Sequence, residues 1–286
     1  MREGAARVFC PLDGPPPKGD KKIDSSSRRK LILAPEPHPR FPSPTIAEAV
    51  CEISFSRDLQ VKLSTAELYK LIGTEFPEMQ PVNPVAVQIL FGDGRQIQPQ
   101  PQPLPRLVPA FRFATPVGDR SVQISDVSFV YQTTAPYPGW STIKATILGL
   151  WGTVRPAIQP GAVTKIGLRY VNRIAKDETH PHLSDWIRAS DHIPAALTRS
   201  RKHFLARVES SPGDDDQLLV TLANQLPVET APLGSIILDI DRVRTSTIGI
   251  DSKDVGEVLE ILHEDIWSVF WSSRTPALEE KLKRSP

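Results

Sequence analysis

The chain has few of the features that mark a disulfide scaffold, a membrane protein or a secreted protein. Its 286 residues include only two cysteines, Cys10 and Cys51, which is too few for a disulfide framework and lacks the spacing of metal-ligating thiols. No window approaches the roughly 18 uninterrupted apolar residues of a membrane span, and the N-terminus has no apolar secretion signal. We therefore expect a cytoplasmic protein without a membrane partner.

Charge of one sign and catalytic motifs are also lacking. The 34 Lys and Arg residues nearly balance the 33 Asp and Glu residues, so no global field attracts the chain to nucleic acid or to an anionic membrane. The sequence contains no G-x-S-x-G nucleophile elbow and no phosphate-binding G-x-x-x-x-G-K or G-x-G-x-x-G loop. Cys51 lies in an apolar segment, where a thiol is usually inert. We expect no catalytic residues, no resident metal and no cofactor.

The composition does provide enough apolar sequence for a core, because 40% of the residues are hydrophobic. These residues are scarce in positions 1–45, which are dense in proline, serine, lysine and arginine. Such a segment buries too little apolar surface to offset the entropy of ordering, so it is predicted to be a disordered leader. Residues 46–286 are predicted to form a single α+β domain.

The stretch VTKIGLRYVNRIAK at 163–176 alternates as a central strand does. Ile166, Leu168 and Tyr170 share one face, while Arg169 and Arg173 share the other. The two guanidinium groups are then about 13 Å apart along the strand, at roughly 3.3 Å per residue. This strand is the clearest indication of a functional surface in the sequence.

The remaining periodicities predict the same order of elements in two halves, namely strand, helix, three strands and helix. The first half is predicted to contain a strand at 46–56, a helix at 64–76 capped by Ser64, strands at 85–91, 106–115 and 121–132, and a helix at 138–155 ended by Pro156. The second is predicted to contain the strand at 163–176, a short helix capped by Ser184, strands at 202–210, 217–225 and 235–242, and a helix at 254–273.

This order predicts a largely antiparallel sheet of about eight strands with the helices packed on it. The two pseudo-repeats cover residues 46–158 and 163–273, and they indicate an internal duplication that rests on element order alone. A separate short helix is predicted at 276–284, where Thr275 and Pro276 provide a cap and a first helical residue.

Several segments together resemble a sporadically distributed prokaryotic protein family of unknown function. These segments are AEAVCEISFS at 47–56, FPE at 76–78, YPGW at 137–140, RYVNRI at 169–174, LDID at 238–241 and VLEILHEDIWSVFW at 258–271. The resemblance covers roughly residues 46–280. It implies a soluble intracellular protein. It indicates neither a particular activity nor particular catalytic residues.

The candidate site consists of Arg169, Arg173, Asp239, Asp241 and Glu52. If the strands that carry them are neighbours, the arginines and aspartates are either cross-strand ion pairs or a polar groove in which arginine binds a carboxylate or phosphate. Alternatively, the three carboxylates could converge on a divalent metal, as in a metal-dependent phosphodiesterase or nuclease. No further lysine or glutamate motif accompanies them.

The favoured function is a non-catalytic binding or adaptor protein that holds a protein or polyanionic partner on a polar sheet face or at a sheet edge. The metal-dependent enzyme remains one alternative. A nucleic-acid-binding protein is another, less favoured, and would require Arg169, Arg173, Arg207, Arg242 and Arg244 to form one stripe. Exposed sheet edges also favour a homodimer.

Overall fold

The computed structural model describes residues 38–58, 63–82, 110–134, 136–229 and 231–285. The strand predicted at 85–91 and most of the predicted leader lie outside the described residues. Residues Arg40–Pro286 form one compact unit.

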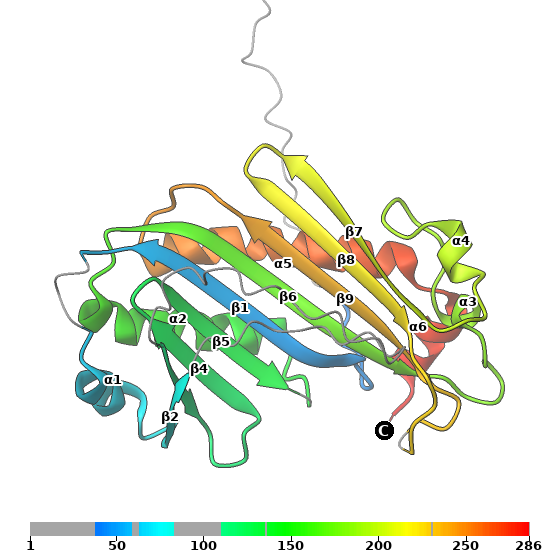
Figure 1. Ribbon diagram of the computed structural model, residues 1–286, viewed down its shortest axis with the longest axis horizontal. Coiled ribbons are helices and arrows are strands. Elements are labelled where there is room, and N and C mark those ends of the chain that lie inside the picture. The colour runs from blue at the N-terminus through cyan, green and yellow to red at the C-terminus, as the bar shows by residue number, and fades with distance from the viewer. Residues whose placement is uncertain (1–37, 59–62, 83–109, 135, 230, 286) are drawn as a thin grey trace, which may run out of the picture. The chain divides into compact units, whose positions relative to one another are not determined.

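An antiparallel sheet of nine strands in the described chain organises the fold and confirms the predicted α+β class (Figure 1). The strands run in the order β2-β3-β4-β5-β1-β6-β9-β8-β7. Their bounds are β1 Ile46–Ser56, β2 Glu78–Val82, β3 Ala110–Ala114, β4 Arg120–Ser125, β5 Ser128–Thr134, β6 Ala162–Ala175, β7 Phe204–Gly213, β8 Asp216–Asn224 and β9 Ser235–Arg244.

The strand order is symmetrical about the centre of the sheet, where β1 and β6 pair with each other. Moving outward, β5, β4 and β3 follow β1, while β9, β8 and β7 follow β6. The strand β2 extends the first half by one more neighbour. The places of β3, β4 and β5 beside β1 thus mirror those of β7, β8 and β9 beside β6, although the strands predicted for the first pseudo-repeat are not the ones that fill these places.

The segment 121–132 was expected to be one strand, and that expectation is wrong. It divides into β4 and β5, which pair with each other across a tight turn at Asp126 and Val127. The Ser125 Oγ accepts the backbone N–H groups of Val127 and Ser128, at 3.2 and 3.0 Å, and so fixes the turn. Serine side chains commonly stabilise turns in this way.

Two long helices, α2 (Trp140–Ile158) and α5 (Ser252–Ser273), pack on the same face of the sheet and lie behind it in Figure 1. The predicted stop of α2 at Pro156 is wrong, because the helix continues past this proline to Ile158; proline removes one N–H donor, but its fixed φ is compatible with a helix. The residue after the helix, the C-cap Gln159, adopts a left-handed φ of 53°. None of the described helices is long and apolar enough to cross a membrane.

The shorter helices differ from the sequence expectation mainly at their ends. Helix α1 (Thr65–Ile72) begins after the predicted cap Ser64, whose Oγ accepts the Glu67 N–H at 3.3 Å, but it ends before Phe76. His182, not Ser184, precedes α3 (Leu183–Trp186), and α4 (Ala195–Thr198) follows it in the chain. Helix α6 (Pro276–Lys283) begins after Thr275, as predicted.

The core lies between the sheet and these helices, and Trp151 of α2 is at its centre. The Trp151 ring is fully buried and lies 5.8 Å from the ring centroids of both Phe55 on β1 and Phe129 on β5. Its Nε1–H donates to the Ile250 carbonyl at 2.9 Å, so the one polar atom of the ring is satisfied. Trp151 thus joins the sheet, α2 and the segment before α5.

Part of the predicted leader belongs to the folded unit. Phe41 stacks on Trp267 and Trp271 of α5, with ring centroids 6.3 and 6.2 Å apart. Further along, the Thr45 hydroxyl donates to Asn172 Oδ1 at 2.9 Å. The predicted boundary at residue 46 is therefore too late, because a single aromatic residue in a polar segment finds an aromatic surface in the tertiary fold.

We expect Trp151→Ala to destabilise the protein by about 3–5 kcal/mol, because it leaves a large cavity and removes the hydrogen bond to Ile250. The free energy of unfolding in urea measures this. Val117→Ala is the control, since Val117 is 82% exposed in the β3–β4 turn and should change the stability little. A loss of less than about 1 kcal/mol for Trp151→Ala would contradict the assignment of this core centre.

Candidate functional site

The five residues singled out from the sequence lie on one face of the sheet, opposite to α2 and α5. The register places Arg169 opposite Asp241, Val171 opposite Asp239 and Gly167 opposite Glu52. Alternate residues of the same strands, such as Leu168 and Ile240, are buried on the helix side. We call the outward surface of Glu52, Lys165, Arg169, Arg173, Asp239 and Asp241 the polar face.

Arg169 on β6 and Asp239 on β9 form a bidentate ion pair. Arg169 Nε donates to Asp239 Oδ1 at 2.8 Å, and Arg169 Nη2 donates to Asp239 Oδ2 at 2.7 Å. Asp239 is the diagonal neighbour of Arg169, so the side chain reaches past the residue directly opposite. Because the Arg169 side chain is 46% exposed, water screens the pair, and a cross-strand pair of this kind contributes roughly 0.2–1 kcal/mol.

Asp241, directly opposite Arg169, is the most perturbed carboxyl group on the polar face. Its pKa is raised to about 6, mainly by partial burial and to a lesser extent by the negative charges of Asp239 and Glu52. The positive charges of Arg169 and Arg207 oppose this effect. A carboxyl group of this kind gains or loses its charge near neutral pH.

Glu52 makes its contacts on the β1 side of the polar face. Lys165 Nζ lies 2.8 Å from Glu52 Oε1, and the Ser54 hydroxyl donates to the same oxygen at 3.0 Å. With Asp239 bound to Arg169, two of the three carboxylates proposed as metal ligands are thus neutralised by cations. Within the described ranges, no group of three or more His, Cys, Asp or Glu residues could hold a metal ion.

Arg173 is a cation of the polar face whose guanidinium group is exposed to solvent. Its side chain is on the exposed side of β6, opposite Ile237. Its backbone N–H donates to the Thr45 carbonyl at 2.8 Å, which fixes the strand beneath it. Among the residues that the structure describes, no carboxylate pairs with its guanidinium group.

Arg242 does not join a stripe with Arg169 and Arg173, as the nucleic-acid hypothesis requires. It lies on the helix side of β9 and is buried, with Nε donating to Asp265 at 2.8 Å and Nη2 donating to Asp216 at 2.9 Å. Asp216 also accepts from Arg244 Nε at 2.9 Å, and these guanidinium groups lower the pKa of Asp216 to about 2. The two arginines therefore join β8, β9 and α5 through carboxylates.

A second polar cluster, which sequence alone did not indicate, lies between the sheet and the two long helices. The Tyr170 hydroxyl lies 3.4 Å from the Tyr137 hydroxyl and 3.3 Å from His263 Nδ1. Trp140 stacks on His263 at 4.2 Å, and its Nε1–H donates to Glu260 at 3.2 Å. Burial raises the pKa of Tyr170 well above its usual value, so this phenol stays protonated and acts as a satisfied core group.

The members of this cluster come from YPGW, RYVNRI and VLEILHEDIWSVFW, which are three of the segments that carry the family resemblance. Each residue alone looks like an ordinary aromatic or polar side chain on an amphipathic element. Their mutual contacts depend on β6, α2 and α5 meeting in space. No spacing of residues in the sequence therefore indicated this cluster.

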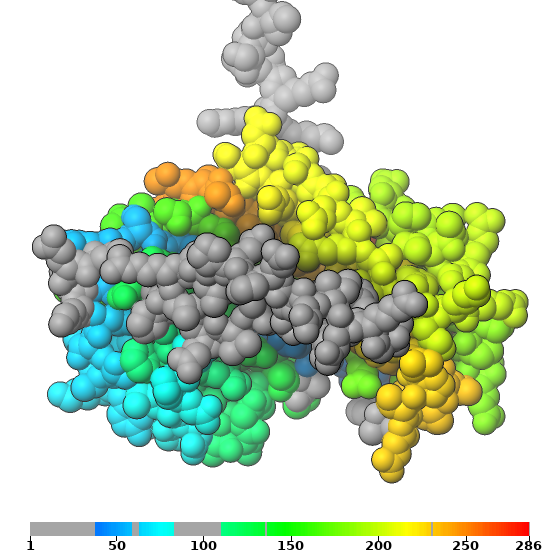
Figure 2. Space-filling view, viewed as in Figure 1, coloured from blue at the N-terminus to red at the C-terminus, as the bar shows by residue number. Residues whose placement is uncertain are grey.

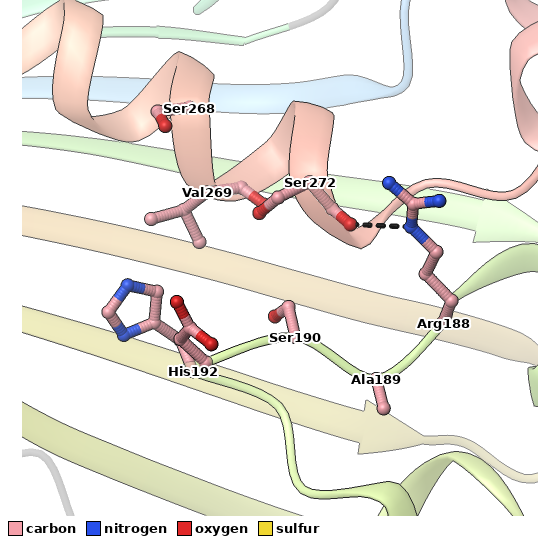
Figure 3. A pocket seen from close by; sticks show the side chains of 8 residues that line it. Arg188, Ala189, Ser190, His192, Ser268, Val269 and Ser272 are labelled. Carbon is pink, nitrogen blue, oxygen red and sulfur yellow. Dashed lines mark hydrogen bonds between the residues drawn. The ribbon is translucent and has the colours of Figure 1, made fainter.

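A pocket of about 400 Å³ opens between the loop after α3 and the end of α5 (Figure 3). Arg188, Ser190, Asp191 and His192 line it from the loop, and Ser268, Val269 and Ser272 line it from the helix. Arg188 Nε donates to the Ser272 carbonyl at 2.7 Å, so this carbonyl in the C-terminal turn of α5 has a hydrogen-bond partner. No residue of the polar face lines this pocket. The guanidinium group of Arg188, which does line it, already caps the C-terminal turn of α5.

Comparisons with protein-family models and with curated proteins found no match to this chain.

We expect Asp241→Asn to stabilise the protein near pH 8, by on the order of 1–3 kcal/mol, and to have little effect near pH 4. The folded-state pKa of Asp241 is raised from 3.8 to about 6, so the protein loses stability as the pH rises from about 4 to about 6 and this carboxyl must ionise in the folded state. Urea unfolding across this pH range measures the difference.

Asp216→Asn is the matched control, because the lowered pKa of Asp216 predicts the opposite sign. This variant should be less stable than the wild type near pH 7, and the loss should shrink as the pH falls toward about 2. Equal pH profiles for the two variants would refute the assigned environment of Asp241.

Proposed function

We propose that this chain is a non-catalytic binding or adaptor protein that holds a protein partner on its polar face. The observation that supports this most is the exposed guanidinium group of Arg173, which pairs with no carboxylate in the described chain. It lies opposite Ile237 on the same strand as Arg169, and the half-buried carboxyl of Asp241 lies four residues further along the same face, opposite Arg169. An exposed cation and a half-buried carboxyl on the same sheet face can together form ion pairs with a partner surface that presents both charges.

The composition of the polar face favours a protein over a polyanion. Glu48, Glu52, Asp239 and Asp241 lie among the arginines, and these carboxylates repel a phosphate backbone. Between the charges lie half-buried apolar side chains from the same strands, namely Val50, Val171 and Ile237. Mixed apolar and charged surfaces of this type are common in protein interfaces.

The alternative functions have less support. A metal-dependent phosphodiesterase would need carboxylates that are free to converge, whereas Glu52 pairs with Lys165 and Asp239 pairs with Arg169. A nucleic-acid-binding protein would need an arginine stripe, whereas Arg242 is buried on the other face of the sheet. Binding of an extended protein surface requires neither.

The setting of this function rests on the sequence motifs and on the topology. We propose that the chain belongs with the prokaryotic family that its motifs resemble, and that it acts in the cytoplasm. The symmetrical order of the strands about β1 and β6 supports an origin by internal duplication. In such an origin, the polar face would be formed where the central strands of the two repeats meet.

Charge reversal at Arg173 tests the binding function. Tagged wild-type protein and the Arg173→Glu variant are used to capture partners from a native lysate, and the bound proteins are identified by mass spectrometry. A partner of the polar face should be lost by at least about tenfold from Arg173→Glu, because each reversed contact replaces attraction with repulsion. It should also be released by raised salt.

Lys253→Glu is the matched control, since Lys253 is a highly exposed lysine at the start of α5, away from the polar face. It should capture the same partner as the wild type. Equal capture by Arg173→Glu and the wild type would refute the role of the polar face. Selective loss of a bound oligonucleotide, with no protein partner, would replace the proposal with polyanion binding.

A further inference from the structure

The strand β7 forms one edge of the sheet and has β8 as its partner on one side. No other described segment pairs with its outer side, so a row of backbone N–H and C=O groups is available there. Figure 2 shows β7 and β8 in yellow at the surface of the molecule. The opposite edge strand, β2, has only five residues and includes Pro81, which cannot donate a ladder hydrogen bond.

The side chains of β7 divide between the two faces of the sheet. Arg207 and Glu209 are exposed on the same side as the polar face, and Arg207 Nε lies 2.8 Å from Glu209 Oε1. Ala206 and Val208 point to the helix side, where their β8 neighbours Leu222 and Val220 are buried. Ala206 and Val208 are themselves only half-buried, because β7 has a neighbour on one side alone.

We propose that a second copy of this chain adds its own β7 to this edge as an antiparallel neighbour, with the two Val208 residues opposite each other. The alternation of charge along β7 selects this partner and this register. A two-fold axis that makes two identical strands antiparallel is perpendicular to the sheet, so each face continues from one copy to the other. Opposed residues must then lie on the same face, which permits only every second register.

Three such registers are centred within the charged part of β7. A register centred on Arg207 places that cation against its own copy, and one centred on Glu209 places two carboxylates together. The register centred on Val208 instead places Arg207 opposite Glu209 of the partner subunit, twice by symmetry. Like charges directly opposite destabilise a sheet, whereas opposite charges stabilise it.

This register also completes both faces of the edge. Val208 meets its own copy on the helix side, and Ala206 meets a small polar residue, Ser210 of the partner subunit. The helices of both copies lie on one side of the joined sheet, and the polar faces lie on the other. If the proposed partner binds the polar face, which this last consequence presupposes, the dimer presents two such faces in one surface and binds bivalently.

Sedimentation velocity of the full chain at increasing concentration tests the dimer. The wild type should show a dimer whose population rises with concentration. Arg207→Glu places two glutamates against two glutamates, and Glu209→Arg places two arginines against two arginines, so each single variant should weaken the dimer by at least about tenfold. Both residues are exposed, and the thermal unfolding midpoint of each variant checks that the fold is intact.

A mixture of the two single variants distinguishes this register from any other contact. In the heterodimer of Arg207→Glu with Glu209→Arg, every opposed pair carries opposite charges, so dimer formation should return to within about threefold of the wild type. The double variant Arg207→Glu with Glu209→Arg should also dimerise. A monomeric wild type, or a dimer that survives both single variants, would overturn the proposal.

The proposed dimer and the proposed binding function of the polar face can be tested independently of each other. Arg173→Glu leaves β7 unchanged and should dimerise as the wild type does, even where it no longer captures a partner. The charge variants of β7 should still capture a single partner on each monomer. Loss of self-association in Arg173→Glu would therefore count against the β7 register and would leave the partner-binding result to be judged on its own.

Discussion

The antiparallel pairing of β1 with β6 is the constraint on which the rest of the structure depends. These are two of the longest strands, and each is covered on the helix side by buried residues such as Cys51 and Leu168. One end of the pair is closed by the hydrogen bond from Thr45 to Asn172, and the other by the Gly161 N–H that donates to the Ser56 carbonyl at 2.7 Å. Because β5 and β9 pair with the outer sides of β1 and β6, an error in this register would displace both halves of the sheet.

Charged side chains have different partners on the two faces of the sheet, because those on the helix side are buried and those on the polar face are in contact with water. On the helix side, Arg242 is buried and forms ion pairs with Asp216 and Asp265 together with hydrogen bonds to two carbonyls, as a buried guanidinium group must. On the polar face, water can satisfy a charge, so Arg173 needs no carboxylate. Buried charge on the helix side therefore joins β8, β9 and α5, whereas the polar face carries the solvent-exposed guanidinium group of Arg173.

The central elements were predictable because their signals are local. The alternation of β1, β6 and β9 follows from a period of two, and the capped starts of α1 and α6 follow from Ser64 and Thr275. Asn172, on the helix side of β6, is a satisfied core amide with hydrogen bonds to Thr45 and to the Leu238 carbonyl. Errors arose where a local signal competes with tertiary contacts. Pro156 did not end α2, and Ser125 turned an apparently continuous strand back on itself.

The sequence by itself determined the α+β class, the antiparallel strands and the sharing of a face by Arg169 with Arg173 and by Asp239 with Asp241, because alternation along one strand fixes which side chains point together. Only the tertiary structure decided that β9 lies beside β6, that Arg169 pairs with the diagonal Asp239, and that Arg242 is buried away from the other arginines. It also decided that Tyr137, Tyr170 and His263 meet. These outcomes depend on which strands and helices are neighbours, and neighbourhood is set by the packing of distant segments and not by the period of any one of them.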